Sequence, residues 1–206
     1  MRTLLAALLA CCLGLGAISA KTDGFTVLTS EAARRADIAH AARALPDAVL
    51  LDERGVSGGL LERLRDDGRI AVVNFIYTRC VSLCLAMGTE YQRLQSDIRR
   101  LGLADRVRLL SISFDPADTP DRLDRYARGM HADAGIWTFA MAPDAAQLRA
   151  LLSAFGIVVI PAPYGQYEHN AAYHLASADG RLERIVDLEE TELLLAYLQR
   201  SGRGPA

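Results

Sequence analysis

Two cysteines separated by three residues follow an apolar run near the middle of the chain. Cys80 and Cys84 come directly after residues 70–77, which are almost continuously apolar, and a helical pattern follows them. A run of this kind is typical of a strand buried on both faces. Residues spaced i, i+4 on one helical face lie about 5–6 Å apart at Cβ. Two thiols held in this way can share a soft metal ion or, with local movement, form a disulfide.

The expected position of the cysteines, at the start of a helix, favours the thiolate form. The helix dipole and the neighbouring Arg79 both stabilise negative charge there. Because the thiolate is both a nucleophile and a metal ligand, thiol redox chemistry and metal binding both stay open. A third interpretation is a disulfide that only staples the turn, although a loop this short gains little from cross-linking. Among soft metals copper fits better than zinc, which normally takes four ligands.

The four histidines are the remaining soft-metal candidates. His40 and His131 fall in helical or turn contexts and are expected to be solvated. His174 falls within an expected strand and is interpreted as a packed residue. His169 lies in an expected loop just before that strand, so it is a candidate third ligand if the fold turns this loop toward the two cysteines.

The first twenty residues have the pattern of a secretory signal peptide. A short basic start precedes the apolar run 4–18, and small residues end it before Lys21. The run is shorter than the roughly 20 apolar residues of a membrane span, so a short anchor is the alternative. We therefore expect a periplasmic protein. The alternative is a periplasmic protein that stays attached to the inner membrane. Cleavage removes Cys11 and Cys12, and an oxidising compartment favours a disulfide between the two cysteines that remain.

The length and net charge of the chain limit which functional classes and domain organisations need to be considered. The 206 residues carry a formal net charge of −2 and no dominant basic stripe, which argues against a nucleic-acid partner. The chain is long enough for one sizeable core, and two compact domains would be crowded. We expect a signal peptide at 1–20, an N-terminal extension at 21–48, one domain at 49–200 and a tail at 201–206.

The order of elements predicts the fold class. Strands are expected at 25–28, 49–51, 70–77, 107–114, 137–141, 171–177 and 182–187. Helices are expected at 30–44, 57–65, 83–101, 120–129, 143–155 and 187–199, with a loop at 161–170. The sum is an α/β protein with a central mixed sheet flanked by helices. With a dithiol at a strand-to-helix turn, this is the thioredoxin-like arrangement.

Three features together resemble the Sco/SenC family of copper-binding, thioredoxin-like assembly factors for cytochrome c oxidase. They are the segment FIYTRCVSLC at 75–84, the segment SISFDPADTP at 111–120, and His169 eleven residues before Gly180. The resemblance extends from about residue 49 to 197. It implies that Cys80, Cys84 and His169 bind copper, as Cu(I) or Cu(II).

The sequence departs from the family pattern at three positions. The family usually has proline after each cysteine, where this chain has Val81 and Leu85, and commonly Asp before the histidine, where it has Glu168. Proline stiffens a turn and removes an N–H donor. The geometry and redox poise of the two thiols are therefore expected to differ from the family pattern.

The resemblance implies an exported copper chaperone rather than an enzyme. Such a protein would deliver copper to the copper-centre subunit of cytochrome c oxidase, or help to mature that centre. The alternative is a thiol-disulfide reductase that keeps the cysteines of a copper protein reduced through Cys80 and Cys84. Other periplasmic copper chaperones or thiol reductases are further expected partners, and the chain is expected to be a monomer.

Overall fold

The computed structural model describes residues 12–17, 19, 29–80 and 83–201. The helices are α2 (Ser30–His40), α3 (Leu60–Asp67), α4 (Leu83–Arg100), α5 (Pro120–Gly129), α6 (Ala145–Phe155) and α7 (Thr191–Ser201), with 3-10 turns η1 (Pro163–Gly165) and η2 (Leu188–Glu190). The strands are β1 (Arg43–Ala44), β2 (Val49–Asp52), β3 (Ser57–Gly59), β4 (Ile70–Ile76), β5 (Val107–Ser113), β6 (Trp137–Met141), β7 (Val159–Ala162), β8 (Gln166–His169), β9 (Tyr173–Ala176) and β10 (Arg181–Val186).

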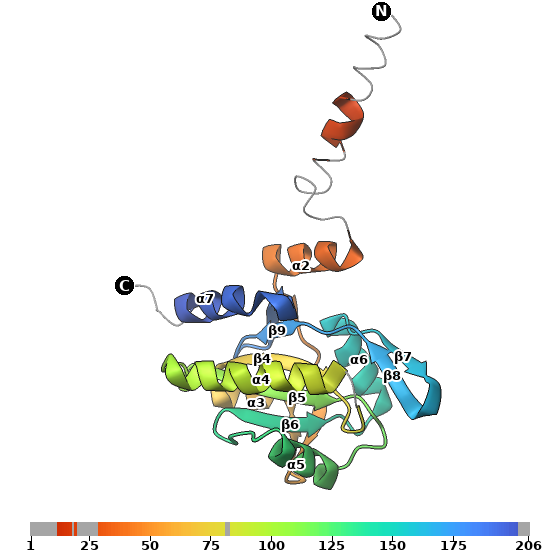
Figure 1. Cartoon of the computed structure of the whole chain (residues 1–206), viewed down its shortest axis with the longest axis vertical. Coiled ribbons are helices and arrows are strands. Elements are labelled where there is room, and N and C mark those ends of the chain that lie inside the picture. Colours follow the sequence, from red (N-terminus) through yellow and green to blue (C-terminus); the bar gives the residue numbers. More distant parts are fainter. Residues whose placement is uncertain (1–11, 18, 20–28, 81–82, 202–206) are drawn as a thin grey trace, which may run out of the picture.

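One mixed sheet forms the centre of the molecule (Figure 1). Its strand order is β1-β10-β9-β4-β5-β6-β2-β3, and β4, β5 and β6 run parallel. The neighbours on either side pair antiparallel: β9 with β4, and β2 with β6. Ile76 lies opposite Ser113, so β4 and β5 end level with each other. The residues that follow these two strands therefore emerge side by side.

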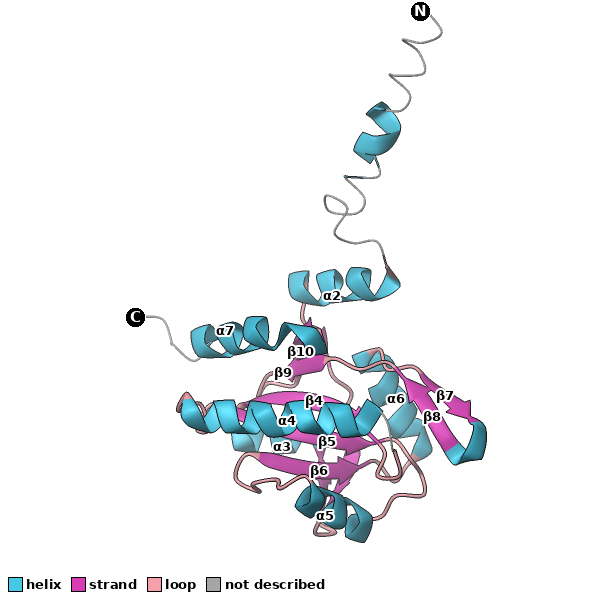
Figure 2. Ribbon diagram, in the orientation of Figure 1, coloured by secondary structure: helices cyan, strands magenta, loops and turns pink. Residues whose placement is uncertain are grey.

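Helices cover both faces of this sheet, and each face has its own apolar core (Figure 2). On one face, α4 contributes Met87, Tyr91, Leu94 and Ile98, and α5 and α7 complete the layer. On the other face α2, α3 and α6 pack against the sheet, with Phe155 of α6 fully buried. The central strands are buried along nearly their whole length, as their apolar runs predicted.

Local signals set the ends of the helices that flank the site. The Thr119 side chain accepts a hydrogen bond from the Arg122 N–H and caps α5, whose first residue is Pro120. Asp144 caps α6 in the same way. Gly156 ends α6 in the left-handed conformation, at φ 68°.

Most predicted elements are confirmed, and the exceptions have physical reasons. The expected helix at 57–65 is wrong in its first part, because Ser57–Gly59 pairs with β2 as strand β3 and α3 begins at Leu60. Gly58 and Gly59 disfavour helix at those positions. The expected loop at 161–170 is also wrong, since most of it forms the hairpin β7–β8 and η1.

The segment before residue 49 contributes to the sheet and to its core. The expected helix at 30–44 ends at His40, because Arg43–Ala44 forms β1, which pairs with β10 and makes this edge of the sheet. Ile38 of α2 is buried against the sheet. The predicted strand at 25–28 and most of the predicted signal peptide at 1–20 lie outside the described residues. Within the described part of the chain, no helix is both long and apolar enough to cross a membrane.

Candidate metal centre

Cys80 lies in the turn that leaves the end of β4. Its backbone N–H donates to the carbonyl of Tyr77 at 3.3 Å, which closes a tight turn through Thr78 and Arg79. The cysteine is only 6% exposed and belongs to the apolar cluster that also contains Tyr77 and Phe114. The fold therefore holds Cys80 against the level ends of β4 and β5.

A buried carboxylate, Asp118, fastens this turn to the segment that follows β5. Asp118 accepts hydrogen bonds from the Thr78 backbone N–H at 3.0 Å, from the Thr78 hydroxyl, and from the Ser113 hydroxyl at 2.6 Å. Only 2% of Asp118 is exposed. Hydrogen bonds to an ionised acceptor are stronger than neutral ones, so this contact sets the position of the turn.

A second buried carboxylate, Asp115, binds the residue before the cysteine. Arg79 Nη2 lies 2.7 Å from Asp115 Oδ2, and Arg79 Nε donates to the same oxygen at 3.1 Å. Asp115 Oδ1 accepts the Ala117 N–H at 2.9 Å. The charge of Arg79 is thus paired with Asp115, so its predicted support of the Cys80 thiolate is weakened by that neighbouring negative charge.

Cys84 lies in the first turn of α4, which begins at Leu83. Its side chain and Val81 lie outside the part of the chain that the structure describes. Since Cys80 precedes the described helix and Cys84 is within it, the two backbone positions lie on either side of the strand-to-helix junction. The predicted pairing of the two thiols stays a prediction.

His169 is the last residue of β8, on the hairpin that replaces the expected loop. Its ring packs edge-on against Phe114, with centroids 5.0 Å apart, and against Tyr77 at 6.3 Å. These two aromatic residues are the ones that directly follow β5 and β4. His169 and Cys80 are therefore brought to the same end of the central sheet, as predicted from the expected topology.

The tautomer of His169 follows from its hydrogen bond. Nδ1 lies 3.0 Å from the backbone carbonyl of Asn170, and a carbonyl can only accept, so Nδ1 carries the proton. In the neutral ring the lone pair that binds metals is then on Nε2. Burial lowers the pKa of His169, and the Asn170 carbonyl opposes this in part. The ring is accordingly neutral at neutral pH, which is the form that binds metal.

Tyr77 and Asn170 hold the hairpin in place. The Tyr77 hydroxyl donates to Gln166 or to the carbonyl of Tyr167, at 3.1 and 3.2 Å, and accepts the Tyr167 N–H at 3.2 Å. Asn170 accepts the Val158 N–H at 2.8 Å and donates to the Gly156 carbonyl at 3.0 Å. A residue in the cysteine turn thus positions the histidine strand directly.

The remaining histidines lie as expected. His40 and His131 are exposed, and His174 is fully buried. Among the side chains that the structure describes, no group of three His, Cys, Asp or Glu residues is arranged to hold a metal ion. Because the Cys84 side chain is outside that set, the predicted Cys80, Cys84 and His169 site is not tested by this observation.

Sequence reasoning did not assign the residues that position the site. Asp115 and Asp118 belong to the segment 111–120, which we noted only for its resemblance, and Tyr77 only as the end of a strand. The available signal was that Asp115 and Asp118 follow a strand expected to neighbour β4. Short polar residues after adjacent parallel strands meet at one edge of a sheet.

Comparisons with known proteins identify relatives of this chain. A family model described as SCO1/SenC matches residues 56–200. The SCO1 protein homolog of Bacillus subtilis is 28% identical over 125 residues, which cover 59% of this chain and 63% of that relative. The chain therefore matches less than two thirds of the length of this relative.

Solved structures share the fold at lower identity. BsSco, a member of the Sco family of cytochrome c oxidase assembly proteins with a disulfide switch, superposes with a TM-score of 0.65 at 21% identity, over 78% of this chain and 94% of BsSco. Copper-bound ScoI of Bradyrhizobium japonicum gives 0.61 at 24% identity, over 76% and 98%. These matches establish the thioredoxin-like fold. Together with the family model, which spans well over half of the sequence, they show that the chain belongs to the SCO1/SenC family.

Proposed function

We propose that this protein is an exported copper chaperone that binds one copper ion through Cys80, Cys84 and His169. The observation that carries the proposal is the position of His169. Its neutral ring, with Nδ1 committed to the Asn170 carbonyl, is packed on Tyr77 and Phe114 at the sheet edge where the Cys80 turn begins. The chemistry of the donors also fits copper, because thiolate and imidazole are ligands that Cu(I) and Cu(II) accept in small numbers.

Copper is the cargo, and the residues of the chain prepare its binding. Thiol ligands must lose their protons before they bind a metal, so loading releases protons and weakens at acid pH. Asp118 and Asp115 fix the turn that carries Cys80, and Tyr77 fixes the strand that carries His169. Since a disulfide has no thiolate to offer, reduction of Cys80 and Cys84 is a precondition for loading in an oxidising compartment.

We propose that the acceptor is the copper-centre subunit of cytochrome c oxidase. BsSco is a member of a family of cytochrome c oxidase assembly proteins, and ScoI of Bradyrhizobium japonicum has a structure with copper bound. The predicted domain at 49–200 would act in the periplasm after removal of residues 1–20, or while held at the inner membrane by them. It would act as a monomer, with a thiol reductase or a second copper chaperone as a further partner.

Copper retention by the reduced protein tests the ligand set. Wild-type protein should keep about one equivalent of copper after desalting, whereas His169→Ala and Cys80→Ser should lose it. His40→Ala is the matched control, since His40 is an exposed histidine on α2. Equal retention by all four proteins would rule out this copper site.

A thiol-disulfide reductase is the second candidate, and the disulfide switch described for BsSco favours it. In that reaction the Cys80 and Cys84 thiols would become a disulfide and give two electrons and two protons to a disulfide in the target protein. This chemistry needs no histidine. Reduction of an oxidised copper-site peptide by His169→Ala at the wild-type rate, with no copper retained by wild-type protein, would favour the reductase over the chaperone.

A further inference from the structure

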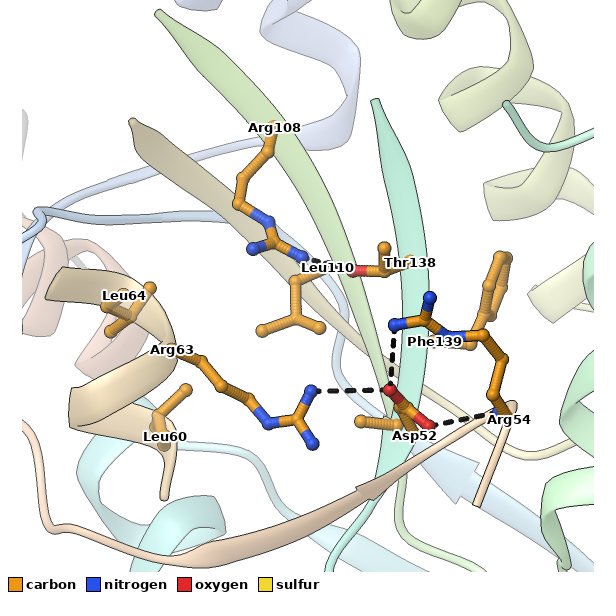
Figure 3. Close-up of a pocket in the computed structure, with 10 residues that line it drawn as sticks. Asp52, Arg54, Leu60, Arg63, Leu64, Arg108, Leu110, Thr138 and Phe139 are labelled. Atoms are coloured by element: carbon orange, nitrogen blue, oxygen red, sulfur yellow. Dashed lines mark hydrogen bonds and ion pairs between the residues drawn. The ribbon is translucent and has the colours of Figure 1, made fainter. Parts of the chain in front are cut away.

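A cavity of about 150 Å³ lies between α3 and the strands β2, β5 and β6, away from the candidate metal centre (Figure 3). Three arginines, Arg54, Arg63 and Arg108, line it together with Asp52 and Thr138. Arg108 is the second residue of β5, whereas the cysteine turn meets the segment that follows the last residue of that strand. None of these cavity residues takes part in positioning Cys80 or His169.

Positive charge is in excess around this cavity. Asp52 accepts the Arg54 and Val56 N–H groups at Oδ1, and its Oδ2 lies 3.2 Å from Arg54 Nη2 and 3.5 Å from Arg63 Nη1. Figure 3 shows the guanidinium groups of Arg54 and Arg63 converging on this carboxylate. Hydrogen bonds from Val56 and Arg54 keep the pKa of Asp52 low, against the effect of burial, so Asp52 is ionised at neutral pH.

Arg108 shares its carboxylate partner with another arginine. Its Nη1 lies 2.9 Å from Asp67 Oδ2, and Asp67 also pairs with Arg69 at 2.7 Å. Burial lowers the pKa of Arg108, Asp67 opposes this, and the positive charges of Arg69 and Arg63 lower it further. Three arginines and one carboxylate, Asp52, thus line the cavity, and Arg108 shares its partner Asp67 with Arg69, so positive charge exceeds negative charge among the lining side chains.

Two buried donors at this cavity are also unused. The Nε atoms of Arg63 and Arg108 are buried, and neither has a hydrogen-bond partner among the described residues. The Arg108 side chain is 14% exposed, and its Nη2 donates to the Thr138 hydroxyl. A buried donor that makes no hydrogen bond costs more free energy than a typical hydrogen bond contributes. An anion with several acceptor oxygens in the cavity would offset the excess positive charge of its lining.

We propose that this cavity binds a small oxyanion of the phosphate class. The planar guanidinium group matches the geometry of phosphate oxygens. A cavity of about 150 Å³ is as large as one that admits benzene, so its volume is sufficient for a tetrahedral oxyanion. Water in the cavity cannot balance the excess charge of its lining. The Asp52 carboxylate already accepts hydrogen bonds, and it would hold the guanidinium groups of Arg54 and Arg63 in position for the anion.

Titration with inorganic phosphate tests the proposal directly. The side-chain Nε–H resonances of Arg63 and Arg108 in the full-length protein should shift and saturate as phosphate is added at constant ionic strength. Matched additions of chloride should leave both resonances unchanged. If neither resonance shows a saturable change with phosphate, or if chloride gives the same change, the cavity holds water or screening ions and the proposal is wrong.

Charge-removing variants provide an independent measurement. Arg63→Gln and Arg54→Gln should each weaken phosphate binding at least tenfold, seen as a loss of the phosphate-dependent rise in Tm. Arg93→Gln is the matched control, because Arg93 is an exposed arginine paired only with Glu90 among the ion pairs of the described residues. Arg63 also donates to the Val56 carbonyl, so Arg63→Gln could fail to fold. In that case Arg54→Gln decides, because the Arg54 side chain is 74% exposed. Unchanged phosphate binding in Arg54→Gln would overturn the proposal, and copper retention should be the same in all of these variants.

Discussion

Two histidines five residues apart, His169 and His174, are held by the same kind of environment. Each donates from Nδ1 to a backbone carbonyl, His169 to Asn170 at 3.0 Å and His174 to Val73 at 3.3 Å. Each ring also lies edge-on to two aromatic rings. For His169 these belong to Tyr77 and Phe114, and for His174 to Phe75 and Phe155. Orientation and tautomer are therefore the same at both positions.

The two histidines differ in how deeply their rings are buried. His169 is half-buried at the end of a hairpin. His174 is 1% exposed, and its Nε2 is buried without a hydrogen-bond partner in the described part of the chain. Burial is the main cause that lowers the pKa of His174 to about 4, and the nearby positive charge of Arg34 adds to it. The comparison teaches that a carbonyl and two edge-on aromatic rings can orient a fully buried imidazole as well as a half-buried one, so the burial of the ring is what separates the two positions.

Removing the imidazole of His169 should lower copper affinity more than any other change that we consider. Removing a residue that only orients a metal ligand lowers metal affinity by about 10–100-fold. Because His169 is proposed as a ligand itself, we expect His169→Ala to lower copper affinity by at least about a hundredfold. The free energy of unfolding should change by less than about 1 kcal/mol, as for partly exposed sites. Competition with a copper chelator and urea unfolding measure the two quantities. If His169→Ala instead lowers the free energy of unfolding and leaves copper affinity unchanged, His169 is a packing residue and not a copper ligand.

The opposite pattern is expected at His174. His174→Ala should cost about 3 kcal/mol in unfolding free energy, because it leaves a cavity between Phe75 and Phe155. His174→Leu should be close to neutral, since it fills much of that space and removes an unpaired buried nitrogen. Both variants should retain copper like wild-type protein. Loss of copper in the well-folded Leu variant would mean that His174 contributes to the metal centre.

Between pH 6.5 and pH 4, His174 should contribute to the acid dependence of stability, together with His169, whose pKa is also lowered. The folded-state pKa of His174, about 4, lies below the ordinary 6.5, so in this window the unfolded chain binds the proton and the folded chain does not. The stabilisation is complete above pH 6.5, falls as the pH drops toward 4, and falls no further below that. The total is roughly 3 kcal/mol, at about 1.4 kcal/mol per pKa unit. Urea unfolding across this range should give a flatter curve for His174→Leu, and an equal slope would contradict the assignment.

Sequence patterns were sufficient for the parts of the fold in which burial is continuous. The strands β4, β5 and β6 and the helix α4 follow directly from apolar runs and helical spacing. The hairpin β7–β8 could not be recognised in this way. Its residues are mostly exposed or half-buried, and Pro161 lies inside it, so neither burial periodicity nor strand composition marks it.

Sequence reasoning proposed Cys80, Cys84 and His169 as ligands, which stays a prediction, but it did not identify the residues that position them. His169 could be proposed from its place just before a predicted strand and from the family resemblance. The contacts of Asp118 with Thr78 and of Tyr77 with the hairpin join residues about 40 and 90 positions apart in sequence. Such contacts depend on the order of strands in the sheet, which is set by the packing of the whole domain.

The smallest effect we predict is at the Tyr77 hydroxyl, which links the cysteine turn to the histidine hairpin. Tyr77→Phe keeps the ring that packs on His169 and Phe114 but removes three hydrogen-bond contacts to Gln166 and Tyr167. We expect a loss of about 1 kcal/mol in stability and of about tenfold in copper affinity, as for residues that orient a ligand. The measurements are urea unfolding and chelator competition on the reduced protein.

Tyr91→Phe is the matched control, because the buried Tyr91 hydroxyl has no hydrogen-bond partner among the described residues. Its removal should leave copper affinity unchanged and stability equal or slightly higher. If Tyr77→Phe lowers stability without changing copper affinity, the hydroxyl supports the fold alone. The rings of Tyr77 and Phe114 would then be sufficient to orient His169, as the rings of Phe75 and Phe155 are at His174.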